Sequence, residues 1–342
     1  MMTLVQNDGW VSQRLAADLA DAENRFVAEL LSDLPCVNRL VTHIERYRGK
    51  MLRPTLVILS GLASRGDTDG EADTTRHRVI AAVVEMVHMA TLVHDDVLDD
   101  ARVRRGGITV NELEGNETAV MLGDYLISHA YHLCSSLDMP RISQRIADAT
   151  NTVCEGELLQ LANRRNWELD ERTYFEIIRR KTASLCGTCC GLGAELSGAD
   201  AAARDGLYDY GEKVGVAFQI VDDLLDLVGR EETVGKSLGR DLQKGKLTLP
   251  LIHFFNEGNP AQRRRLRALC DELAELDLAD AGCDRLLAEA RELVTAGPSV
   301  PYARQWAARL VAQAKASLGV LPDSPARQLM SSMADAVLAR QA

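Results

Sequence analysis

The chain has few aromatic residues and no long uncharged apolar run, and both shortages limit what it can be. Only 4% of its 342 residues are Phe, Trp or Tyr, although 46% are hydrophobic, so a core must be mainly aliphatic. No uncharged apolar segment reaches the roughly 18 residues needed to cross a bilayer. The nearest candidate, Val79 to Val93, contains Glu85 and His88. The first residues resemble neither a signal peptide nor an Arg-rich transit peptide. We therefore expect a cytoplasmic protein without a transmembrane segment.

Excess positive charge and a disulfide framework are also absent. The chain has 39 Lys and Arg against 50 Asp and Glu, a net charge of −11, which argues against nucleic acid as the main partner. Eight cysteines scattered over this length indicate reduced thiols. The densest group, Cys186-Gly187-Thr188-Cys189-Cys190, has no second Cys/His pair at useful spacing for zinc. Because small residues flank it, it favours a closely packed helix face.

Apolar residues recur at three- and four-residue spacing almost throughout, and the alternation typical of strands is scarce. This periodicity predicts an all-α protein. No linker divides the chain, so we expect a single domain over 1–342, a helical bundle around a central cavity. The polar segment Gly229 to Thr248, with four glycines, is expected to be a mobile flap. The predicted helices are Val11–Leu31, Val37–Tyr47, Pro54–Ala63, Arg76–Asp99, Thr118–Ser136, Arg141–Ala162, Glu171–Leu196, Ala201–Leu227, Leu249–Phe255 and several beyond Pro260.

The same acidic motif occurs twice within strongly apolar helical sequence, as Asp95-Asp96-Val97-Leu98-Asp99 and Asp222-Asp223-Leu224-Leu225-Asp226. Residues four apart share one face of a helix, so each motif presents two carboxylates together. An unpaired buried carboxylate is very costly, and two such faces repel each other unless a strong positive charge lies between them. Mg²⁺ takes oxygen ligands and commonly brings substrate phosphates with it. The repeat therefore predicts a site for metal and diphosphate.

Basic residues cluster beside apolar helix ends, where they could hold phosphate. Gly49-Lys50-Met51-Leu52-Arg53-Pro54 places Lys50 and Arg53 at a helix start, where backbone N–H groups also favour an anion. Further cations follow the first acidic motif, lie within a predicted helix, or lie in and close the flap; they are Arg104, Arg105, Lys181, Lys236 and Lys246. Each feature alone is typical of a solvated surface. Together they interrupt the most apolar helices, which an ordinary surface does not explain.

With these residues the chain resembles the trans-isoprenyl diphosphate synthases, the polyprenyl synthetase family. The resemblance runs from about Gly49 to Pro250, with the family's motifs in order. They are Gly49-Lys-x-x-Arg-Pro54, Glu85-x-x-His88, the two acidic motifs, Arg104-Arg105-Gly106, Gly156-Glu157-x-x-Gln160, Lys181-Thr182, Gln219 before the second acidic motif, and Asp241-Leu242-x-x-Gly245-Lys246-x-Thr248-Leu249-Pro250. Family members often end in a basic stretch near the active site, whereas this sequence ends Leu338-Ala339-Arg340-Gln341-Ala342.

The resemblance implies an isoprenoid-synthase fold, a homodimer, and Mg²⁺-dependent condensation of isopentenyl diphosphate with an allylic diphosphate. About three Mg²⁺ per site are implied, with Mn²⁺ as the alternative ion. Asp95, Asp99 and Asp222 would be ligands, supported by Asp96, Asp223 and Asp226. The allylic diphosphate would be held by Arg104, Lys181, Lys236 and Lys246. Isopentenyl diphosphate would be held by Lys50, Arg53, His88 and Arg105. The backbone carbonyls near Lys181 and Thr182, and the side chain of Gln219, would stabilise positive charge on the reacting chain.

In this family the growing tail runs beneath the first acidic motif, where bulky residues stop it early. Here Met89, Ala90 and Thr91 occupy the positions just upstream, and none is aromatic. We therefore expect a product longer than twenty carbons. The alternative is a short-chain farnesyl or geranylgeranyl synthase, in which a residue lower in the cavity forms the floor that stops the growing tail. Candidates for that floor are Met86, Met121, Tyr125 and Ile146.

Two more distant alternatives remain. A class I terpene cyclase shares the fold and an aspartate-rich motif, but its second metal motif usually differs from a second DDxxD, and it has no need for Lys50, Arg53 and His88. A non-catalytic subunit of a heteromeric synthase usually lacks one or both acidic motifs, and this chain keeps both.

Overall fold

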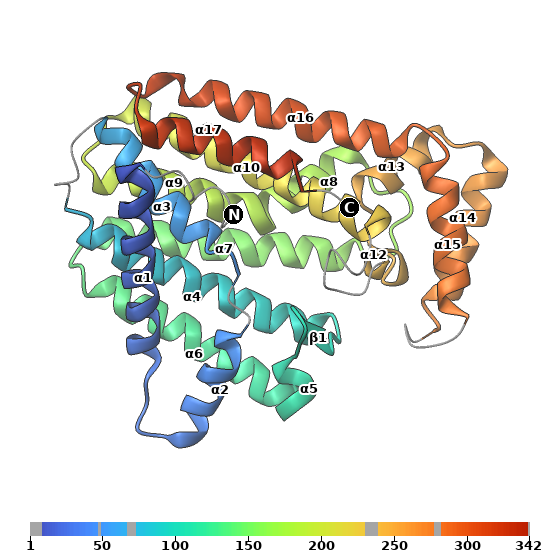
Figure 1. Cartoon of the computed structure of the whole chain (residues 1–342). Coiled ribbons are helices and arrows are strands. Elements are labelled where there is room, and N and C mark those ends of the chain that lie inside the picture. Colours follow the sequence, from blue (N-terminus) through green and yellow to red (C-terminus); the bar gives the residue numbers. More distant parts are fainter. Residues whose placement is uncertain (1–8, 47–48, 67–72, 230–238, 277–281, 341–342) are drawn as a thin grey trace. The chain divides into compact units, whose positions relative to one another are not determined.

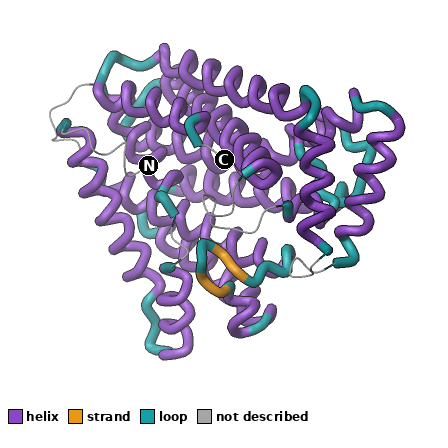
Figure 2. Tube along the Cα trace, turned by 45° about the vertical axis from the view of Figure 1, so that its right-hand side comes forward, coloured by secondary structure: helices purple, strands orange, loops and turns teal. Residues whose placement is uncertain are grey.

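The computed structural model describes residues 9–46, 49–66, 73–229, 239–276 and 282–340, and these are mostly helical (Figure 1). Two strands of two residues each form the only sheet in those ranges, marked in orange in Figure 2. The elements are α1 (Trp10–Leu30), α2 (Pro35–Glu45), α3 (Leu52–Arg65), α4 (Thr75–Leu98), β1 (Val103–Arg104), β2 (Gly107–Ile108), α5 (Val110–Glu114), α6 (Asn116–Ser135), α7 (Pro140–Ala162), α8 (Glu171–Ile178), the π-helix η1 (Arg179–Ala183), α9 (Ser184–Leu196), α10 (Ala201–Val228), α12 (Arg240–Gln243), α13 (Leu249–Glu257), α14 (Pro260–Leu273), α15 (Cys283–Thr295), α16 (Ser299–Ser317), the 3₁₀ turn η2 (Leu318–Val320) and α17 (Pro325–Leu338).

The all-α prediction is confirmed, and the predicted helix ends up to α13 lie within two residues of those observed where these are described. Four details were missed, the first of them the short helix α5, which no predicted helix covers. The expected turn at 102–109 contains the hairpin β1–β2, and the expected continuous helix 171–196 is interrupted by η1. The expected flap contains the short helix α12 in the part that the structure describes.

Contacts along the backbone group the chain into two compact units. The first comprises residues 1–151, 185–212 and 315–333, and the second comprises 152–184, 213–314 and 334–342. The expectation of a single domain over 1–342 stays a prediction.

The core of the first unit is built around α4, which packs against α6, α3 and α1 (Figure 1). Residues 79–87 in the middle of α4 are all buried, and apart from Glu85 they are Val, Ala, Ile and Met, as a mainly aliphatic core requires. Two acidic residues of this helix, Glu85 and Asp96, are buried as well. A buried carboxylate needs hydrogen-bond donors or a counter-charge, so Glu85 and Asp96 each require polar or charged neighbours within the core.

The cysteine-rich segment lies on α9 and is closely packed. A side chain at Gly211 of α10 would come within 2.5 Å of the Cys186 carbonyl oxygen and 2.8 Å of Cys190 Sγ, so the two helices touch through small residues. Cys186, Cys189 and Cys190 are free and buried. Burial raises the pKa of the Cys186 and Cys189 thiols, which keeps them protonated and poorly suited to hold zinc.

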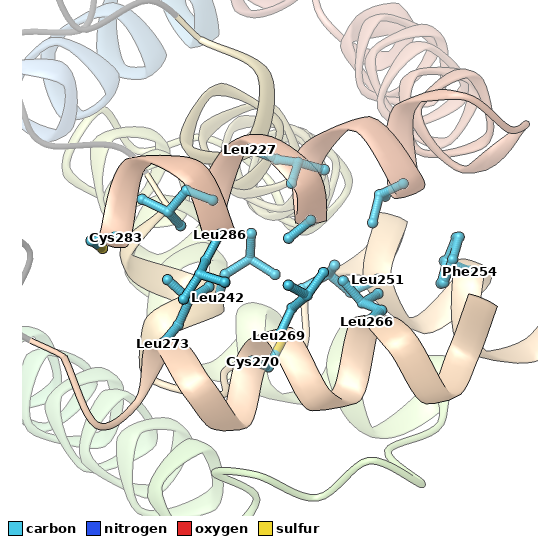
Figure 3. Packing of buried hydrophobic residues seen from close by; sticks show 13 residues of the cluster. Leu227, Leu242, Leu251, Phe254, Leu266, Leu269, Cys270, Leu273, Cys283 and Leu286 are labelled. Atoms are coloured by element: carbon cyan, nitrogen blue, oxygen red, sulfur yellow. The ribbon is translucent and has the colours of Figure 1, made fainter. Parts of the chain in front are cut away.

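The second unit has its own hydrophobic cluster. Leucines from α10, α12, α13, α14 and α15 interdigitate there, with Phe254 at one side (Figure 3). Leu227, which follows the second acidic motif by one residue, belongs to this cluster. The helix that carries the second motif is thereby anchored by burial of its C-terminal end.

Among the described helices, none combines the length and the apolar character required to cross a bilayer.

His77 fixes the start of α4 against the end of α9. Its Nε2 donates to the Gly193 carbonyl oxygen at 3.0 Å and lies 3.0 Å from Ser197 Oγ. The ring is 1% exposed, and burial lowers its pKa to about 4, although the Gly193 carbonyl opposes the shift. The folded chain therefore holds His77 neutral at pH 5, where the unfolded chain protonates it.

This asymmetry predicts a pH-dependent loss of stability. Because the folded-state pKa is depressed, the contribution of His77 is complete above pH 6.5 and is lost as the pH falls toward 4. Urea unfolding at pH 7 and pH 5 should show that the wild type loses about 2 kcal/mol more than His77→Gln over this interval. Equal losses in the two proteins would contradict the assignment.

Candidate active site

The first acidic motif ends α4, and its three carboxylates have different surroundings. The N–H of Asp99 donates to the Asp95 carbonyl oxygen at 2.8 Å, so Asp95 and Asp99 are one helical turn apart. Both side chains are half-buried, whereas Asp96 is 1% exposed. Arg104 Nε donates to both oxygens of Asp96 at 2.8 and 2.9 Å, and its Nη2 lies 2.7 Å from Oδ1. Asp96 is thus committed to an ion pair inside the protein.

The hairpin after α4 positions the two arginines of Arg104-Arg105-Gly106. Val103 pairs with Ile108 and Arg104 with Gly107. The two residues between them, Arg105 and Gly106, have φ of 50° and 78°, as a type I′ turn requires. A non-glycine residue in the left-handed region carries a strain of about 1 kcal/mol or more. The chain keeps Arg105 there despite this cost, which points to a role for its side chain.

Arg105 lies against the segment that begins with Gly49. A Cβ built on Gly49 would lie only 2.5 Å from Arg105 Nη2 and 2.8 Å from its Cζ, so the guanidinium fills the space a side chain would need. Glycine at position 49 is explained by this contact. It joins the basic start of α3 to the hairpin.

A concentration of positive charge surrounds His88. Burial lowers its pKa well below the usual range, and Arg53, Arg105 and Arg104 lower it further. The imidazole is therefore neutral at physiological pH and can donate one hydrogen bond. Arg53 is half-buried, and its Nε is buried without a hydrogen-bond partner among the described residues, while Lys50 is exposed. Cations gathered in this way, one with an unused buried donor, suit an anion.

Arg104 differs from the other arginines near His88 because it is paired with Asp96. Burial alone would lower its pKa, but the hydrogen bond and the charge of Asp96, with the charges of Asp95 and Asp99, raise it above the ordinary value. Its charge is thus fixed beside the first acidic motif.

The residues expected to set product length lie on the same helix. Met89 and Ala90 are fully buried, and Thr91 is half-buried and donates its hydroxyl to the His88 carbonyl oxygen at 2.7 Å. Of the alternative floor residues, Met86 and Ile146 are fully buried and Met121 is 64% exposed. Tyr125 is half-buried and donates to the Leu30 carbonyl oxygen at 3.2 Å.

In the second unit, the π-helix η1 positions Lys181 and Thr182. A Cβ on Gly156 of α7 would lie 2.5 Å from the Lys181 backbone nitrogen, so glycine there lets α7 approach the wide turn closely. Lys181 pairs with Glu157, and Gln160 donates to Glu157 at 3.0 Å. Single π turns inside α-helices are frequent at functional sites.

Thr182 begins a chain of hydrogen bonds that reaches the second acidic motif. Its hydroxyl donates to Gln219 Oε1 at 2.9 Å, and Gln219 Nε2 donates to Asp223 Oδ1 at 2.8 Å. The hydroxyl of Tyr174 donates to Asp223 Oδ2 at 2.7 Å. Asp223 is 3% exposed, and burial raises its pKa to about 6 although the Lys246 charge opposes the shift. This carboxylate is held by neutral donors.

Asp226 and the residues after 239 are also tied together. The backbone N–H of Asp241 donates to Asp226 Oδ2 at 3.1 Å, and Lys246 Nζ lies 3.1 Å from Asp241 Oδ1. Asp226 is 5% exposed, whereas the side chain of Asp222 is 31% exposed. Lys236, expected to bind the allylic diphosphate, lies outside the described residues.

The site residues therefore fall into two groups. The first unit contains Lys50, Arg53, His88, Asp95, Asp96, Asp99, Arg104 and Arg105, and the second contains Lys181, Thr182, Gln219, Asp222, Asp223, Asp226 and Lys246. Sequence reasoning assigned no role to Tyr174, Glu157 or Asp241. Glu157 and Asp241 belong to recognised motifs and could have been found there, whereas nothing in the sequence marked Tyr174.

The carboxylates of the two acidic motifs fit a hard divalent cation that also coordinates the phosphate oxygens of a bound substrate. Among the described residues, no three or more His, Cys, Asp or Glu side chains form a cage that could hold a metal alone. Mg²⁺ rarely uses such a cage; it takes one or two carboxylates and fills the remaining positions with water and substrate phosphates. Asp95, Asp99 and Asp222 are half-buried, so their side chains are partly open to such an ion.

The family model for polyprenyl synthetase matches residues 35–280. The chain belongs to the polyprenyl synthetase family. It is therefore an enzyme of the prenyltransferase class, and the all-α fold agrees with solved structures of that family.

Three similar proteins show the range of named activities. Octaprenyl diphosphate synthase from Escherichia coli is 34% identical over 331 residues, 96% of this chain and 98% of that protein. A short chain isoprenyl diphosphate synthase from Methanothermobacter thermautotrophicus is 33% identical, covering 96% and 97%. The structure of a Caulobacter crescentus polyprenyl synthase complexed with calcium and isoprenyl diphosphate has a TM-score of 0.87 and 31% identity, covering 98% and 100%. Other relatives are named heptaprenyl, nonaprenyl and decaprenyl diphosphate synthases.

The unequal surroundings of the first motif predict unequal effects of two matched substitutions. Asp96→Asn removes the charge that Arg104 pairs with inside the protein, and should lower the free energy of unfolding by about 2 to 3 kcal/mol. Asp95→Asn, one residue earlier, should change it by less than about 0.5 kcal/mol while abolishing turnover. Urea unfolding measures both. Equal destabilisation by the two substitutions would refute the division of the motif.

Proposed function

We propose that the chain is a long-chain all-trans polyprenyl diphosphate synthase that condenses isopentenyl diphosphate head-to-tail with an allylic diphosphate. The observation that carries the proposal is the pairing of two acidic motifs with a separate group of cations around His88. One reactant must ionise beside carboxylates that hold metal, and the other must be held by an anion-binding group of its own. The two groups of side chains supply these two functions.

Asp95, Asp99 and Asp222 would hold Mg²⁺, or Mn²⁺ in its place. The bound ions would supply Lewis-acid stabilisation of the charge on the leaving diphosphate. Asp96, Asp223 and Asp226 keep the ligand carboxylates in place, because their own oxygens are occupied by protein donors. The division follows from burial and hydrogen bonding.

The allylic diphosphate would be bound by Arg104, Lys181, Lys236 and Lys246. Arg104 and Lys181 are pre-oriented by Asp96 and Glu157, so little side-chain entropy is lost on binding. Isopentenyl diphosphate would be bound by Lys50, Arg53, His88 and Arg105. Neutral His88 can donate to a diphosphate oxygen without adding a further charge to three neighbouring arginines.

Thr182 and Gln219 would act on the reacting carbons. The new carbon–carbon bond forms when the isopentenyl double bond attacks the allylic carbon, whose bond to diphosphate oxygen breaks with the electron pair going to the diphosphate. Loss of a proton then restores a double bond, and the released diphosphate is the expected acceptor, since no side-chain base is evident in the part of the chain that the structure describes. The Gln219 carboxamide is fixed by Thr182 and Asp223, which orients its dipole for stabilising positive charge.

The length of the product would be set by the small, fully buried Ala90 on α4. A tail that passes this position meets no aromatic ring from Met89, Ala90 or Thr91. The relatives named octaprenyl to decaprenyl synthases support a product longer than twenty carbons. The short-chain relative keeps the alternative open, and the product itself decides between them.

A homodimer is part of the proposal. Helix α6 exposes Val120 at 41% and Met121 at 64%, an apolar surface of the kind that a second subunit covers.

Incubation with Mg²⁺, isopentenyl diphosphate and farnesyl diphosphate tests the function directly. We expect release of diphosphate and an elongated prenyl chain longer than twenty carbons, measured by chromatography of the dephosphorylated products. Omission of the metal should abolish turnover. No turnover with any allylic diphosphate would refute the enzyme proposal, and products of fifteen or twenty carbons from shorter primers would establish the short-chain alternative.

Ala90→Phe should shorten the product, because a ring at this position would block the path of the tail. Val320→Phe, at a position 53% exposed on η2, serves as the matched control and should leave the product length unchanged. An unchanged product length in Ala90→Phe would show that a residue elsewhere stops the growing tail.

Gly49→Ala should weaken the binding of isopentenyl diphosphate, because the new methyl group displaces the Arg105 guanidinium. We expect a roughly tenfold rise in KM for isopentenyl diphosphate and a smaller change in KM for the allylic substrate. Gly297→Ala is the control, since a Cβ there meets no atom within 4 Å. Equal KM values in both variants and the wild type would show that the contact does not position Arg105.

A further inference from the structure

The turn that follows α7 contacts the residue before Lys246. Arg165 donates its backbone N–H to the Gly245 carbonyl oxygen at 2.8 Å. A Cβ built on Gly245 would lie 2.6 Å from Arg165 Cγ and 3.5 Å from its Cα and Cβ, so the stem of the arginine covers this glycine. Both residues belong to the second unit. The backbone and the side chain of Arg165 thus both act on Gly245.

Both partners of this contact have a left-handed backbone. The φ angle is 58° at Arg165 and 62° at Gly245. Glycine reaches this region freely, whereas an arginine there is strained. Arg165 is an exposed residue, so burial of its side chain does not explain why the turn keeps this conformation. The contact with Gly245 supplies a reason.

Two asparagines hold the turn in shape. Asn163 Nδ2 donates to the Leu159 carbonyl oxygen at 2.9 Å, which satisfies a carbonyl group at the C-terminal end of α7. Asn166 Nδ2 donates to Asn163 Oδ1 at 2.9 Å, and the Asn166 backbone N–H donates to the Asn163 carbonyl oxygen at 3.2 Å. Arg165 lies between these asparagines, so the direction of its N–H is set by the turn itself.

The segment that contains Lys246 is held at both ends. At its start, the Asp241 N–H donates to Asp226 Oδ2 at 3.1 Å. At its end, Gly245 accepts from Arg165. The Lys246 N–H donates to the Asp241 carbonyl oxygen at 2.8 Å, and Lys246 Nζ lies 3.1 Å from Asp241 Oδ1. The direction of the lysine side chain therefore depends on the second acidic motif and on the turn after α7.

Helix α7 also positions a second lysine of the proposed diphosphate site. Glu157 on α7 pairs with Lys181, and Gln160, one turn later, donates to Glu157 at 3.0 Å. The Asn163 N–H donates to the Gln160 carbonyl oxygen at 3.1 Å and so continues α7 into the turn. The supports of the two lysines are successive turns of one element, and a helix holds a binding group more precisely than a loop does.

We propose that Arg165 is a positioning residue for Lys246, and that α7 with its turn holds Lys181 and Lys246 at the separation that one diphosphate requires. The Arg165 N–H holds the Gly245 carbonyl group, and the arginine stem occupies the space beside Gly245, so Lys246 keeps one direction. Arg165 acts through Gly245 and needs no contact with substrate. This inference rests on the proposed function, because it takes both lysines as ligands of the allylic diphosphate.

Introducing a clash and then removing it tests the contact. Gly245→Ala places a methyl group 2.6 Å from Arg165 Cγ, so the arginine and residue 245 must move apart. Inorganic diphosphate in saturating Mg²⁺, followed by calorimetry, should then bind roughly tenfold weaker, as for the loss of one charged donor. Adding Arg165→Ala removes Cγ and leaves ordinary contacts at 3.5 Å. In this double variant the affinity should return to within about threefold of the wild type. Unchanged affinity in Gly245→Ala, or no recovery in the double variant, would overturn the proposal.

Steady-state kinetics distinguish positioning from general damage. In Gly245→Ala the KM for the allylic substrate should rise roughly tenfold, whereas the KM for isopentenyl diphosphate should not change, since its proposed ligands belong to the first unit. An equal rise in both KM values would contradict a role confined to Lys246. Elongation by the wild type is measured in parallel. Its absence would refute the proposed function, whereas elongation with unchanged diphosphate affinity in Gly245→Ala would refute only the role of Arg165.

Two further variants control for strain and for folding. Gly198→Ala also places alanine at a positive φ, 74°, but its Cβ meets no atom within 4 Å, so diphosphate affinity should not change. A loss of affinity in both glycine variants would assign the effect to backbone strain and overturn the proposal. Asn163→Ala loosens the turn without touching Gly245, and should weaken diphosphate binding roughly threefold even if Gly245→Ala folds poorly. Unchanged binding in Asn163→Ala would remove the turn from the proposal.

Discussion

Burying a carboxylate is costly unless donors surround it, and the chain meets this cost at both acidic motifs. Asp96 is enclosed by the guanidinium of Arg104, Asp223 by the side chains of Tyr174 and Gln219, and Asp226 by the backbone of Asp241. These contacts bind the ends of α4 and α10 to the hairpin, to α8 and to α12. Everything proposed for the site depends on them, because they hold the neighbouring carboxylates in place.

The satisfied carboxylates also show how one short motif can serve both packing and chemistry. In the first motif Asp96 is turned into the protein and Asp95 and Asp99 stay half-buried, whereas in the second motif Asp223 and Asp226 are buried and Asp222 stays half-buried. The basic residues follow the same division. Arg104 is bound to Asp96, whereas Arg53 and Arg105 crowd around a neutral His88 where an anion would relieve their repulsion. Pre-oriented charge of this kind binds a diphosphate with little reorganisation.

The sequence predicted much of the fold because the helical periodicity is strong and the apolar runs are long. It also predicted the prenyltransferase class, which the family match confirms, from two DDxxD motifs inside apolar helices and from the clustered Lys and Arg residues. It could not predict the hairpin turn, where Arg105 adopts a left-handed conformation normally left to glycine or asparagine. Nor could it predict η1, because a π turn changes the hydrogen-bonding pattern without a distinctive residue pattern.

Partners that are distant along the chain were also beyond sequence reasoning. Tyr174 and Asp223 are 49 positions apart, and Arg340 and Asp222 are 118 apart. The need for glycine at position 49 became clear only from the position of Arg105, and the need for glycine at 156 only from the position of η1. Local patterns identify what a residue can do, while tertiary contacts decide which carboxylate in a motif remains available for a ligand.

The division of each motif can be tested by anomalous diffraction at the manganese edge, from crystals grown with Mn²⁺ and inorganic diphosphate. We expect manganese peaks at coordination distance from Asp95, Asp99 and Asp222, with Asp96 still paired to Arg104, Asp223 to Tyr174 and Gln219, and Asp226 to the Asp241 N–H. Manganese bound by Asp96, Asp223 or Asp226, with those contacts broken, would contradict this division.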